Sequence, residues 1–332
     1  MCWVYIEYKK GERHEKKKLR RQKEIVVHTD PHMKGSAAKL GLHKGCWLPV
    51  VLFPDDQLLD DIWDFSLRTD DIIVCSFPKS GTTWLQEIVY LIMNDLDVQK
   101  AQSANIEARF PYIEYVYPGL KDLSKLKGQR LMKSHLPYHH LPHEVMEGKS
   151  KVLYIARNPK DVAVSYYHFA KMFRESSYTG TMENFSDSFL SGQVPYGPWV
   201  IHVQEFYEMA KLKRNVMFIM YEDLKEDPEK VIKQIAKFLG KDLTPEQVSG
   251  IAKYCTFENM KKNPAANYSW WDEYGLRNKD STPFLRKGHV GDWKNHLSPR
   301  LSKEFDLHLQ QWFSANGSLS FRELLPEKKD KE

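Results

Sequence analysis

The amino-acid sequence predicts an α/β fold, a single domain in which helices flank a central parallel sheet. Two observations lead to this prediction. Short apolar runs bounded by loop residues alternate with amphipathic stretches, and the 332-residue chain has neither an internal repeat nor a long Gly/Ser- or Pro-rich linker that would divide it. We place the domain at residues 45–325, after a charged extension over residues 1–44 that we expect to be flexible and before a charged tail over residues 326–332.

The predicted elements follow one another in a regular order. Residues 72–77, 130–133, 152–156 and 216–220 have the length and composition of buried strands. Between and after them, Leu85, Ile88, Val89 and Ile92 have helical spacing, as do the apolar positions of residues 162–173, 203–212 and 231–239. In such a sheet, ligands bind beyond the carboxyl ends of the strands, so the loops that follow these strands are expected to carry the chemistry.

The charge pattern argues against a nucleic-acid partner. Residues 9–23 hold nine basic and two acidic side chains, a net charge of +7, whereas the whole chain carries +5. The remainder therefore carries about −2, and the basic segment is expected to be a solvated arm rather than a nuclear-localisation signal or an anion-binding surface.

Other features of composition predict a soluble protein of the reducing cytoplasm. No stretch reaches the roughly 18 to 20 apolar residues of a membrane span, and the first ten residues do not build the apolar core of a secretory signal. Cys2, Cys46, Cys75 and Cys255 are scattered without a CxxC pair, which disfavours both a disulfide framework and a zinc knuckle.

The loop after the first predicted strand has the composition of an anion-binding site. Residues 77–84 read FPKSGTTW and lead from a strand into a helix. Gly81 allows close backbone approach, while Thr82 and Thr83 would place hydroxyls and amides at a helix N-terminus, where negative charge is favoured. The string lacks the GxxxxGK[ST] order, which disfavours a magnesium-nucleotide hydrolase. The alternative to an anion-binding site is a loop that only caps the helix and binds no ligand.

Several blocks together resemble one enzyme family. PKSGTTW resembles the phosphosulfate loop of the cytosolic sulfotransferases, which transfer a sulfuryl group from 3′-phosphoadenosine 5′-phosphosulfate (PAPS). The strings KSHLP at 133–137, YIARNPKDVAVSYYHF at 154–169, YED at 221–223, the segment 257–264 and RKGHVGDWK at 286–294 also match, in the family's order. The similarity spans roughly residues 45–325.

The resemblance implies a PAPS-dependent sulfotransferase that acts on the hydroxyl or amine of a small aromatic, steroid or other alcohol acceptor and leaves 3′,5′-adenosine bisphosphate (PAP). His135 would be the general base, because imidazole titrates near neutrality. His135 and Lys133 are two residues apart at the end of a predicted strand, so their side chains can face the same crevice. Lys79 and Lys133 would stabilise the transferring charge, and Ser165 would bind the 3′-phosphate and restrain Lys79.

No metal is expected in this reaction. The donor already has a good leaving group, and the sequence shows no acidic pair placed to hold magnesium. His139, His140 and His143 form a cluster, but Pro142 interrupts it and no cysteine accompanies it, so we interpret it as loop.

The family's cofactor site corresponds to eighteen positions here. The 3′-phosphate would bind the RNPKDVAVS and RKG blocks, where arginine's planar fork suits a phosphate, and aromatic rings would enclose the adenine. The predicted cofactor-binding residues are Lys79, Ser80, Gly81, Thr82, Thr83, Trp84, Arg157, Ser165, Tyr221, Cys255, Thr256, Phe257, Met260, Phe284, Leu285, Arg286, Lys287 and Gly288.

The acceptor pocket of the family is aromatic. The matching residues here are Tyr112, Tyr115, Lys133, His135, Phe169 and Tyr196, and Trp47 and Phe53 are candidates for the roof. Tyrosine stands at some positions where phenol-type members have phenylalanine, so we expect a somewhat more polar pocket. Core packing alone would also account for each aromatic residue.

The family's dimer motif, Lys-x-x-x-Thr-Val-x-x-x-Glu, is degenerate here. It aligns with residues 294–303, where Ser298 and Pro299 replace threonine and valine and Lys303 replaces glutamate. The proline removes a backbone donor and the lysine reverses a charge, so a homodimer is allowed but only weakly supported.

Three alternatives remain beside sulfuryl transfer. A binding protein without catalysis would usually have a damaged loop or base, and both are intact here. One insect branch of the family dehydrates an allylic alcohol through a sulfated intermediate, which the product's mass would reveal. A nucleotide kinase would require Mg-ATP.

Overall fold

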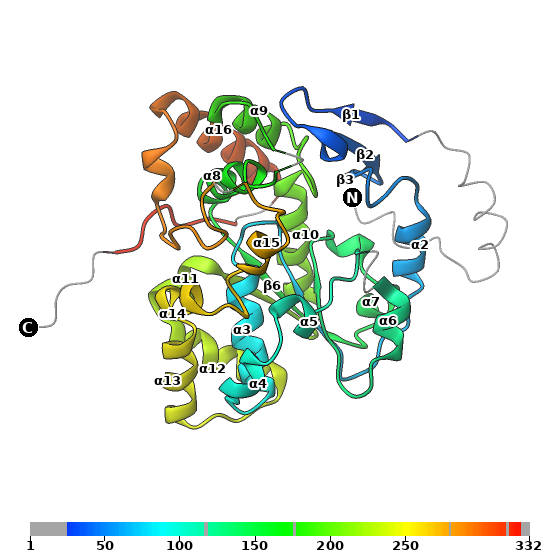
Figure 1. The fold of residues 1–332 in the computed structure, drawn as a ribbon, viewed down its shortest axis with the longest axis vertical. Coiled ribbons are helices and arrows are strands. Elements are labelled where there is room, and N and C mark those ends of the chain that lie inside the picture. Colours follow the sequence, from blue (N-terminus) through cyan, green and yellow to red (C-terminus); the bar gives the residue numbers. More distant parts are fainter. Residues whose placement is uncertain (1–24, 116–118, 175–176, 279, 317–318, 327–332) are drawn as a thin grey trace, which may run out of the picture.

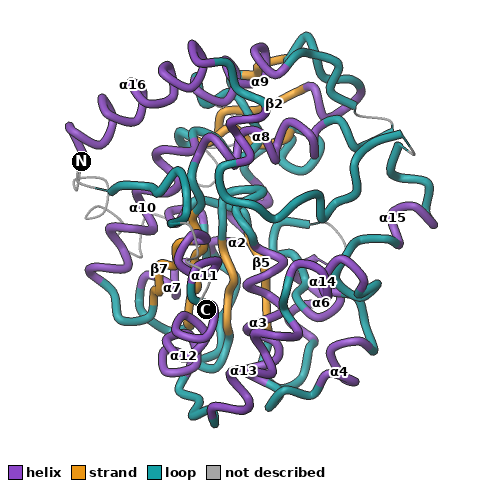
Figure 2. Tube along the Cα trace, turned by 90° about the vertical axis from the view of Figure 1, so that its left-hand side faces the viewer, coloured by secondary structure: helices purple, strands orange, loops and turns teal. Residues whose placement is uncertain are grey.

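The fold was analysed in a computed structural model, which describes residues 25–115, 119–174, 177–278, 280–316 and 319–326. Most of the predicted basic extension and nearly all of the predicted charged tail lie outside these residues. In Figure 1, α8, α9 and α16 lie toward one end of the longest axis and α3, α12 and α13 toward the other. The same grouping is visible after a 90° turn in Figure 2.

The central sheet has four parallel strands. They are β4 (Ile72–Cys75), β5 (Leu131–Ser134), β6 (Lys151–Ala156) and β7 (Val216–Met220), and they lie in the order β5-β4-β6-β7. The four predicted strands are thereby confirmed, with ends that differ by one or two residues. Because β4 is central, the loop that follows it lies between the ends of β5 and β6.

Strands β4 and β7 are wholly apolar and β6 is apolar after Lys151, as expected where both faces of a sheet are buried, whereas β5 ends in Lys133 and Ser134. Ile73 and Cys75 enter the core on one face, together with residues of α8, α9, α10 and α16, whereas Ile72 and Val74 enter the core on the other face with residues of α3, α12 and α13. This alternation with a period of two distributes one continuous apolar run between two helical layers.

The four predicted helices are present. They are α3 (Thr82–Met93), α8 (Pro159–Ala170), α10 (Trp199–Leu212) and α12 (Pro228–Leu239). Local signals explain the boundaries, since Asn158 caps α8 through the amide of Lys160 at 2.9 Å, and a proline occupies the first turn of both α8 and α12. Gly240, with φ of 79°, ends α12 in the left-handed conformation that glycine adopts without strain.

Further helices complete the layers and connections. They are η2 (Gly35–Ala38), α2 (Gln57–Trp63), α4 (Val98–Gln102), α5 (Ile106–Arg109), α6 (Gly119–Lys125), η3 (Tyr138–His140), α7 (His143–Met146), α9 (Met182–Leu190), α11 (Tyr221–Glu226), α13 (Pro245–Tyr254), α14 (Phe257–Lys262), α15 (Trp270–Glu273), η4 (Asp292–Asn295) and α16 (Pro299–Asn316). Among the described residues, no helix has the length and apolar character needed to cross a membrane.

A second sheet alters the predicted start of the domain. Strands β1 (Val27–Thr29), β2 (Lys39–His43) and β3 (Cys46–Pro49) form an antiparallel sheet, which Figure 1 shows in blue beside α9. The predicted boundary at residue 45 falls inside the β2–β3 hairpin, whose turn residues Lys44 and Gly45 both have positive φ. The charged and then Gly/Ser/Lys-rich composition predicts an extension here, but residues 25–44 pack against the domain; the amide of Thr179, for example, donates to the carbonyl of His32 at 2.7 Å.

Candidate active site

The loop between β4 and α3 is tightly wound around its glycine. Lys79 has φ of 70° and Gly81 has φ of 109°. A Cβ at position 81 would lie 2.7 Å from Cδ2 of Tyr221, so only glycine fits here. Ser76 at the strand end and Thr82 at the helix start share a hydrogen bond of 2.6 Å between their hydroxyls, which closes the loop at its base.

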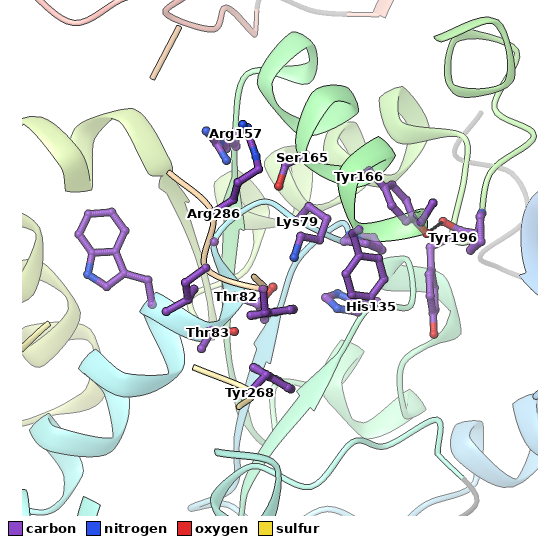
Figure 3. A pocket seen from close by; sticks show the side chains of 18 of the residues that line it. Lys79, Thr82, Thr83, His135, Arg157, Ser165, Tyr166, Tyr196, Tyr268 and Arg286 are labelled. Atoms are coloured by element: carbon purple, nitrogen blue, oxygen red, sulfur yellow. Dashed lines mark hydrogen bonds between the residues drawn. The ribbon is translucent and has the colours of Figure 1, made fainter. Parts of the chain in front are cut away.

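This loop forms one wall of a cavity of about 630 Å³ at the carboxyl ends of the parallel strands. Figure 3 shows Arg157, Ser165 and Arg286 on one side of Lys79, with Tyr166 and Tyr196 on the other side and His135 between. The cavity therefore has a cationic end and an aromatic end, joined at Lys79 and His135.

The hydrogen bonds of His135 define its tautomer. Nδ1 lies 2.7 Å from the carbonyl oxygen of Ser76, which can only accept, so Nδ1 carries the hydrogen and Nε2 keeps its lone pair. The backbone is held on both sides, because the amide donates to Glu114 at 2.5 Å and the carbonyl accepts from Nε2 of His202 at 2.8 Å. Burial lowers the pKa of His135 to about 4, and the charge of Lys79 acts in the same direction. The imidazole is therefore neutral at physiological pH.

The ammonium groups of the two lysines lie against aromatic rings, Lys133 being buried and Lys79 half-buried. Nζ of Lys79 lies 3.7 Å from the ring centroid of Phe284 and 4.5 Å from that of Phe169, and Nζ of Lys133 lies 4.2 Å from that of Tyr112. Burial lowers the pKa of Lys79 to about 7, with Lys133 and two arginines adding to the effect. Burial also lowers the pKa of Lys133 to about 8, although nearby carboxylates oppose this.

The cationic end is built from Arg157, which lies between β6 and α8, and from the segment that follows residue 284. Arg157 donates to the carbonyl of His289 at 2.7 Å, and its buried Nε has no partner among the described residues. Arg286 and Lys287 both donate to Asp292, at 2.6 and 2.7 Å. These hydrogen bonds hold the cations within one concave surface and lower the pKa of Asp292 despite its partial burial.

Three aromatic residues border this end: one packs on a glycine, and the other two contact one another. A Cβ at Gly288 would lie 2.3 Å from Cδ2 of Phe257, so the loop backbone packs directly on that ring. The rings of Trp84 and Tyr221 meet edge to face at 5.4 Å. Flat apolar surfaces therefore lie next to the cations.

At the other end of the cavity, aromatic side chains surround the imidazole of His135. The rings of Tyr112 and Tyr115 are stacked with centroids 4.1 Å apart, and Tyr112 meets the imidazole of His135 at 5.3 Å. Tyr196 lies 5.6 Å from the same imidazole. A flat apolar molecule placed here would have its polar atom close to Nε2.

Most of the predicted site residues line this cavity together. They are Lys79, Gly81, Thr82, Thr83, Trp84, Tyr112, Tyr115, Lys133, His135, Arg157, Ser165, Phe169, Tyr196, Tyr221, Cys255, Phe257, Met260, Phe284, Leu285, Arg286, Lys287 and Gly288.

Ser80 and Thr256 do not line it. The side chain of Ser80 is fully buried beneath the loop. Thr256 caps α14 by accepting from the amide of Asn259 at 3.4 Å.

The two residues predicted to form the roof of the acceptor pocket lie elsewhere in the structure. Trp47 packs on His28 of β1, with ring centroids 6.0 Å apart, and Phe53 is enclosed in the core against His43, so neither lines the cavity. Met33, Ala37, Pro49, Val51 and Leu52 occupy that place instead. They come from the small sheet and its connections, which the sequence had assigned mostly to the extension.

Several lining residues were missed from sequence. They include Glu107, Tyr166, Phe173, Tyr268 and Trp271. Phe169 is predicted from the family resemblance; Tyr166 lies on the same helix and Phe173 falls within the predicted helical stretch 162–173, so their spacing from Phe169 could indicate them. Glu107, Tyr268 and Trp271 lie on short helices or loops with no periodic pattern to predict their direction.

The histidine cluster does not converge on one point. His139 bonds to Glu205 at 2.7 Å, His140 donates to the carbonyl of His43 at 3.1 Å, and His143 donates to the carbonyl of Trp63 at 2.7 Å. Each ring thus has a separate partner.

Comparison with known proteins identifies the family. The model of the sulfotransferase domain matches residues 69–317. The chain belongs to the sulfotransferase family. This sulfotransferase is 39% identical over 266 residues to Sulfotransferase 1E1 of Bos taurus, covering 79% of this chain and 89% of the relative. It is 40% identical over 258 residues to Sulfotransferase 1A1 of Mus musculus, covering 76% and 87%.

Solved structures agree with the sequence match. A retinol dehydratase in complex with androsterone and the inactive cofactor PAP has a TM-score of 0.80 and 25% identity, covering 90% of this chain and 98% of that chain. Mouse sulfotransferase SULT7A1 complexed with PAP has a TM-score of 0.66 and 31% identity, covering 82% and 94%. The predicted fold class and the predicted enzyme class are both confirmed: this protein is a sulfotransferase with a single α/β domain.

Proposed function

We propose that this sulfotransferase transfers the sulfuryl group of PAPS to the hydroxyl of a small aromatic or steroid-like acceptor and leaves PAP. One observation carries the proposal. A neutral imidazole, with Nδ1 fixed on Ser76 and the lone pair of Nε2 unused, stands in one cavity with the ammonium groups of Lys79 and Lys133. Sulfuryl transfer needs a base beside cations, in a space that excludes most water.

The cationic end fits an adenosine carrier with several negative charges. Arg157 has a buried Nε without a partner among the described residues, which a phosphate oxygen would satisfy. Arg286 and Lys287 lie at the same end. Trp84 and Phe257 offer ring surfaces for the base, and the phosphate loop offers the amides at the start of α3.

When bound, PAPS supplies an SO₃ group on a good leaving group. His135 accepts the proton of the acceptor hydroxyl at Nε2, because its Nδ1 is already committed to Ser76. Lys79 and Lys133 stabilise negative charge on the oxygens around the transferring group, an effect worth roughly 3 to 4 kcal/mol per donor in a dry site. Ser165 binds the 3′-phosphate and restrains Lys79 until the acceptor arrives. A metal has no role in this scheme.

The aromatic end orients the acceptor. Tyr112, Tyr196 and Phe169 enclose a flat apolar body, so that its hydroxyl meets His135. The complex of retinol dehydratase with androsterone supports a steroid-like alcohol as an acceptor for a fold of this shape. A primary amine in the same position could be sulfonated by the same groups.

Transfer of labelled sulfate tests the proposal. Purified protein is incubated with sulfur-35-labelled PAPS, a panel of phenols and steroid alcohols, and EDTA. We expect labelled organic sulfates whose mass exceeds that of the acceptor by one SO₃. A protein that binds PAP without transferring label is a binding protein, and activity that requires Mg-ATP would indicate a kinase; either result contradicts the proposal.

A second candidate function is dehydration of an allylic alcohol. The retinol dehydratase complexes have TM-scores of 0.80 and 0.79, above the 0.66 of the mouse sulfotransferase SULT7A1. The same base and cations would first form the sulfate ester. The bond between carbon and the sulfate oxygen then breaks, sulfate leaves, and the carbon skeleton loses a proton, so the product is lighter than the alcohol by one water. With retinol as the acceptor, the product's mass separates the two functions.

A further inference from the structure

One acidic side chain lines the cavity among the residues that the structure describes, and the reaction above leaves it without a task. It is Glu107. The charged side chains that accompany it around the cavity are all basic: Lys79, Lys133, Arg157, Lys225, Arg286 and Lys287. A lone carboxylate in such a wall stands out because burying it costs free energy unless a partner offsets the cost.

The backbone around Glu107 is firmly held. Glu107 belongs to the short helix α5, where the amide of Ile106 donates to the carbonyl of Ala265 at 2.8 Å and the Ile106 side chain is fully buried. Arg109 is buried and forms an ion pair with Glu87. Because both neighbours are anchored, the carboxylate is presented to the cavity by a rigid turn.

The Glu107 carboxylate lacks a partner of its own. It makes no hydrogen bond or ion pair with any other described residue, which places it beyond 4.0 Å from the ammonium of Lys133. Its charge nevertheless raises the pKa of Tyr115, after the larger effect of burial, so it lies near the aromatic end. Burial raises the pKa of Glu107 itself, and a cation beside it would restore the charged form.

The donor cannot supply that cation. PAPS is an anion, and its phosphates and sulfate would be matched by the basic residues at the other end. With the donor bound, Glu107 is the carboxylate that lines the cavity among the described residues, and it shares that cavity with the stacked rings of Tyr112 and Tyr115. A carboxylate next to aromatic faces favours an ammonium group, through ion pairing and cation–π attraction.

We propose that Glu107 binds a protonated amine of the acceptor, so that the preferred substrates are phenols or alcohols that also carry an ammonium group. The amine is held away from the base, and the hydroxyl is placed at His135. The inference rests on the proposed function. The competing interpretation is that Glu107 serves only as a distant counter-charge to Lys133, in which case every acceptor would depend on it equally.

The experiment compares two acceptors of similar shape in two variants. Tyramine carries the ammonium, and 4-propylphenol replaces it with a methyl group. Glu107→Gln removes the charge but keeps the size, and Glu229→Gln on the exposed face of α12 is the matched control. Steady-state kcat/KM is measured for both phenols, and calorimetry measures tyramine binding to the PAP-loaded protein.

We expect Glu107→Gln to lower kcat/KM for tyramine about 10- to 100-fold, with a parallel loss in calorimetric affinity, since hydrogen bonds to charged groups have this strength. The value for 4-propylphenol should stay unchanged, as should both values in Glu229→Gln. Equal losses for both phenols, or an unchanged ratio between them, overturn the role of Glu107 while leaving sulfuryl transfer intact. Failure of the wild type to transfer label to any acceptor overturns the proposed function itself.

Discussion

The Nδ1 hydrogen of His135 is directed at the carbonyl oxygen of Ser76, 2.7 Å away. The two residues end neighbouring parallel strands, because β5 and β4 pair in a register that sets Ser134 beside Cys75. Ser76 also bonds to Thr82 at 2.6 Å, at the far end of the phosphate loop. One serine therefore positions the candidate base and closes the candidate donor-binding loop, which links the two halves of the proposed reaction.

Gly288→Ala should weaken PAP binding by about 1 to 3 kcal/mol, the usual cost of overpacking. The new Cβ would lie 2.3 Å from Cδ2 of Phe257, so the ring must leave its place in the cavity wall. Gly128→Ala is the matched control, because Gly128 has a similar φ of 71° but open space around it. Calorimetry with PAP checks this: equal affinities in the two variants would show that the Gly288–Phe257 contact does not shape the site.

The affinity for PAP should fall as the pH rises above about 7. Burial and neighbouring cations lower the pKa of Lys79 to about 7 in the free protein. Because bound PAP is an anion, it favours the protonated form of Lys79, so the pKa of Lys79 is higher in the complex than in the free protein. Between these two pKa values, the affinity for PAP falls by up to about tenfold per pH unit.

Lys79→Arg provides the control for this pH dependence. Its guanidinium stays charged, while the phosphates of PAP titrate as before. Calorimetry at three pH values between about 6 and 8 should give a flatter profile for the variant. Identical slopes for variant and wild type would contradict a role for Lys79 in holding the anion.

Asp161→Ala should destabilise the fold by about 2 to 3 kcal/mol, because it leaves two backbone amides without an acceptor. The Asp161 carboxylate accepts from the amide of Gly291 at 2.8 Å and from that of Trp293 at 3.0 Å. It thereby fastens the segment that carries Arg286, so PAP affinity should fall as well. Urea unfolding measures the first effect, and Asp187→Ala on α9 is an exposed control. Unchanged stability would contradict this account of the segment.

The protein should be predominantly monomeric at micromolar concentration. Pro299 is the first residue of α16 and has no amide hydrogen to offer a partner, and Lys303 is an exposed cation where the family motif has an acid. Sedimentation velocity should give a species near 39.0 kDa. A stable dimer at this concentration would contradict the prediction. If Lys303→Glu, which restores the acid of the family motif, strengthened that dimer, the degenerate motif would still form the interface.

Sequence reasoning succeeded where a residue's position follows from a continuous element. Strands β4, β6 and β7 are apolar on both faces, so their runs are recognisable in the sequence, and the carboxyl ends of parallel strands must meet at one edge. His135, Lys133 and the loop with Gly81 follow from that rule together with the family blocks.

It was less successful where the site is built from irregular or half-exposed segments. The small sheet has no strong apolar alternation, so Pro49 and Leu52 were not expected to form the roof. Glu107 lies on a helix of four residues, too short for periodicity to predict which way its side chain points. Such directions depend on contacts between distant parts of the chain, like that of Ile106 with Ala265.

The most direct test of the account is the rate of labelled sulfate transfer by His135→Ala with an acceptor that the wild type uses. Loss of the imidazole should slow transfer about 10²- to 10⁴-fold. PAP affinity should remain close to that of wild type, and His308→Ala on α16, outside the cavity, should behave as wild type in both measurements. An alanine variant that transfers sulfate at the normal rate would contradict the assignment of His135 as the base.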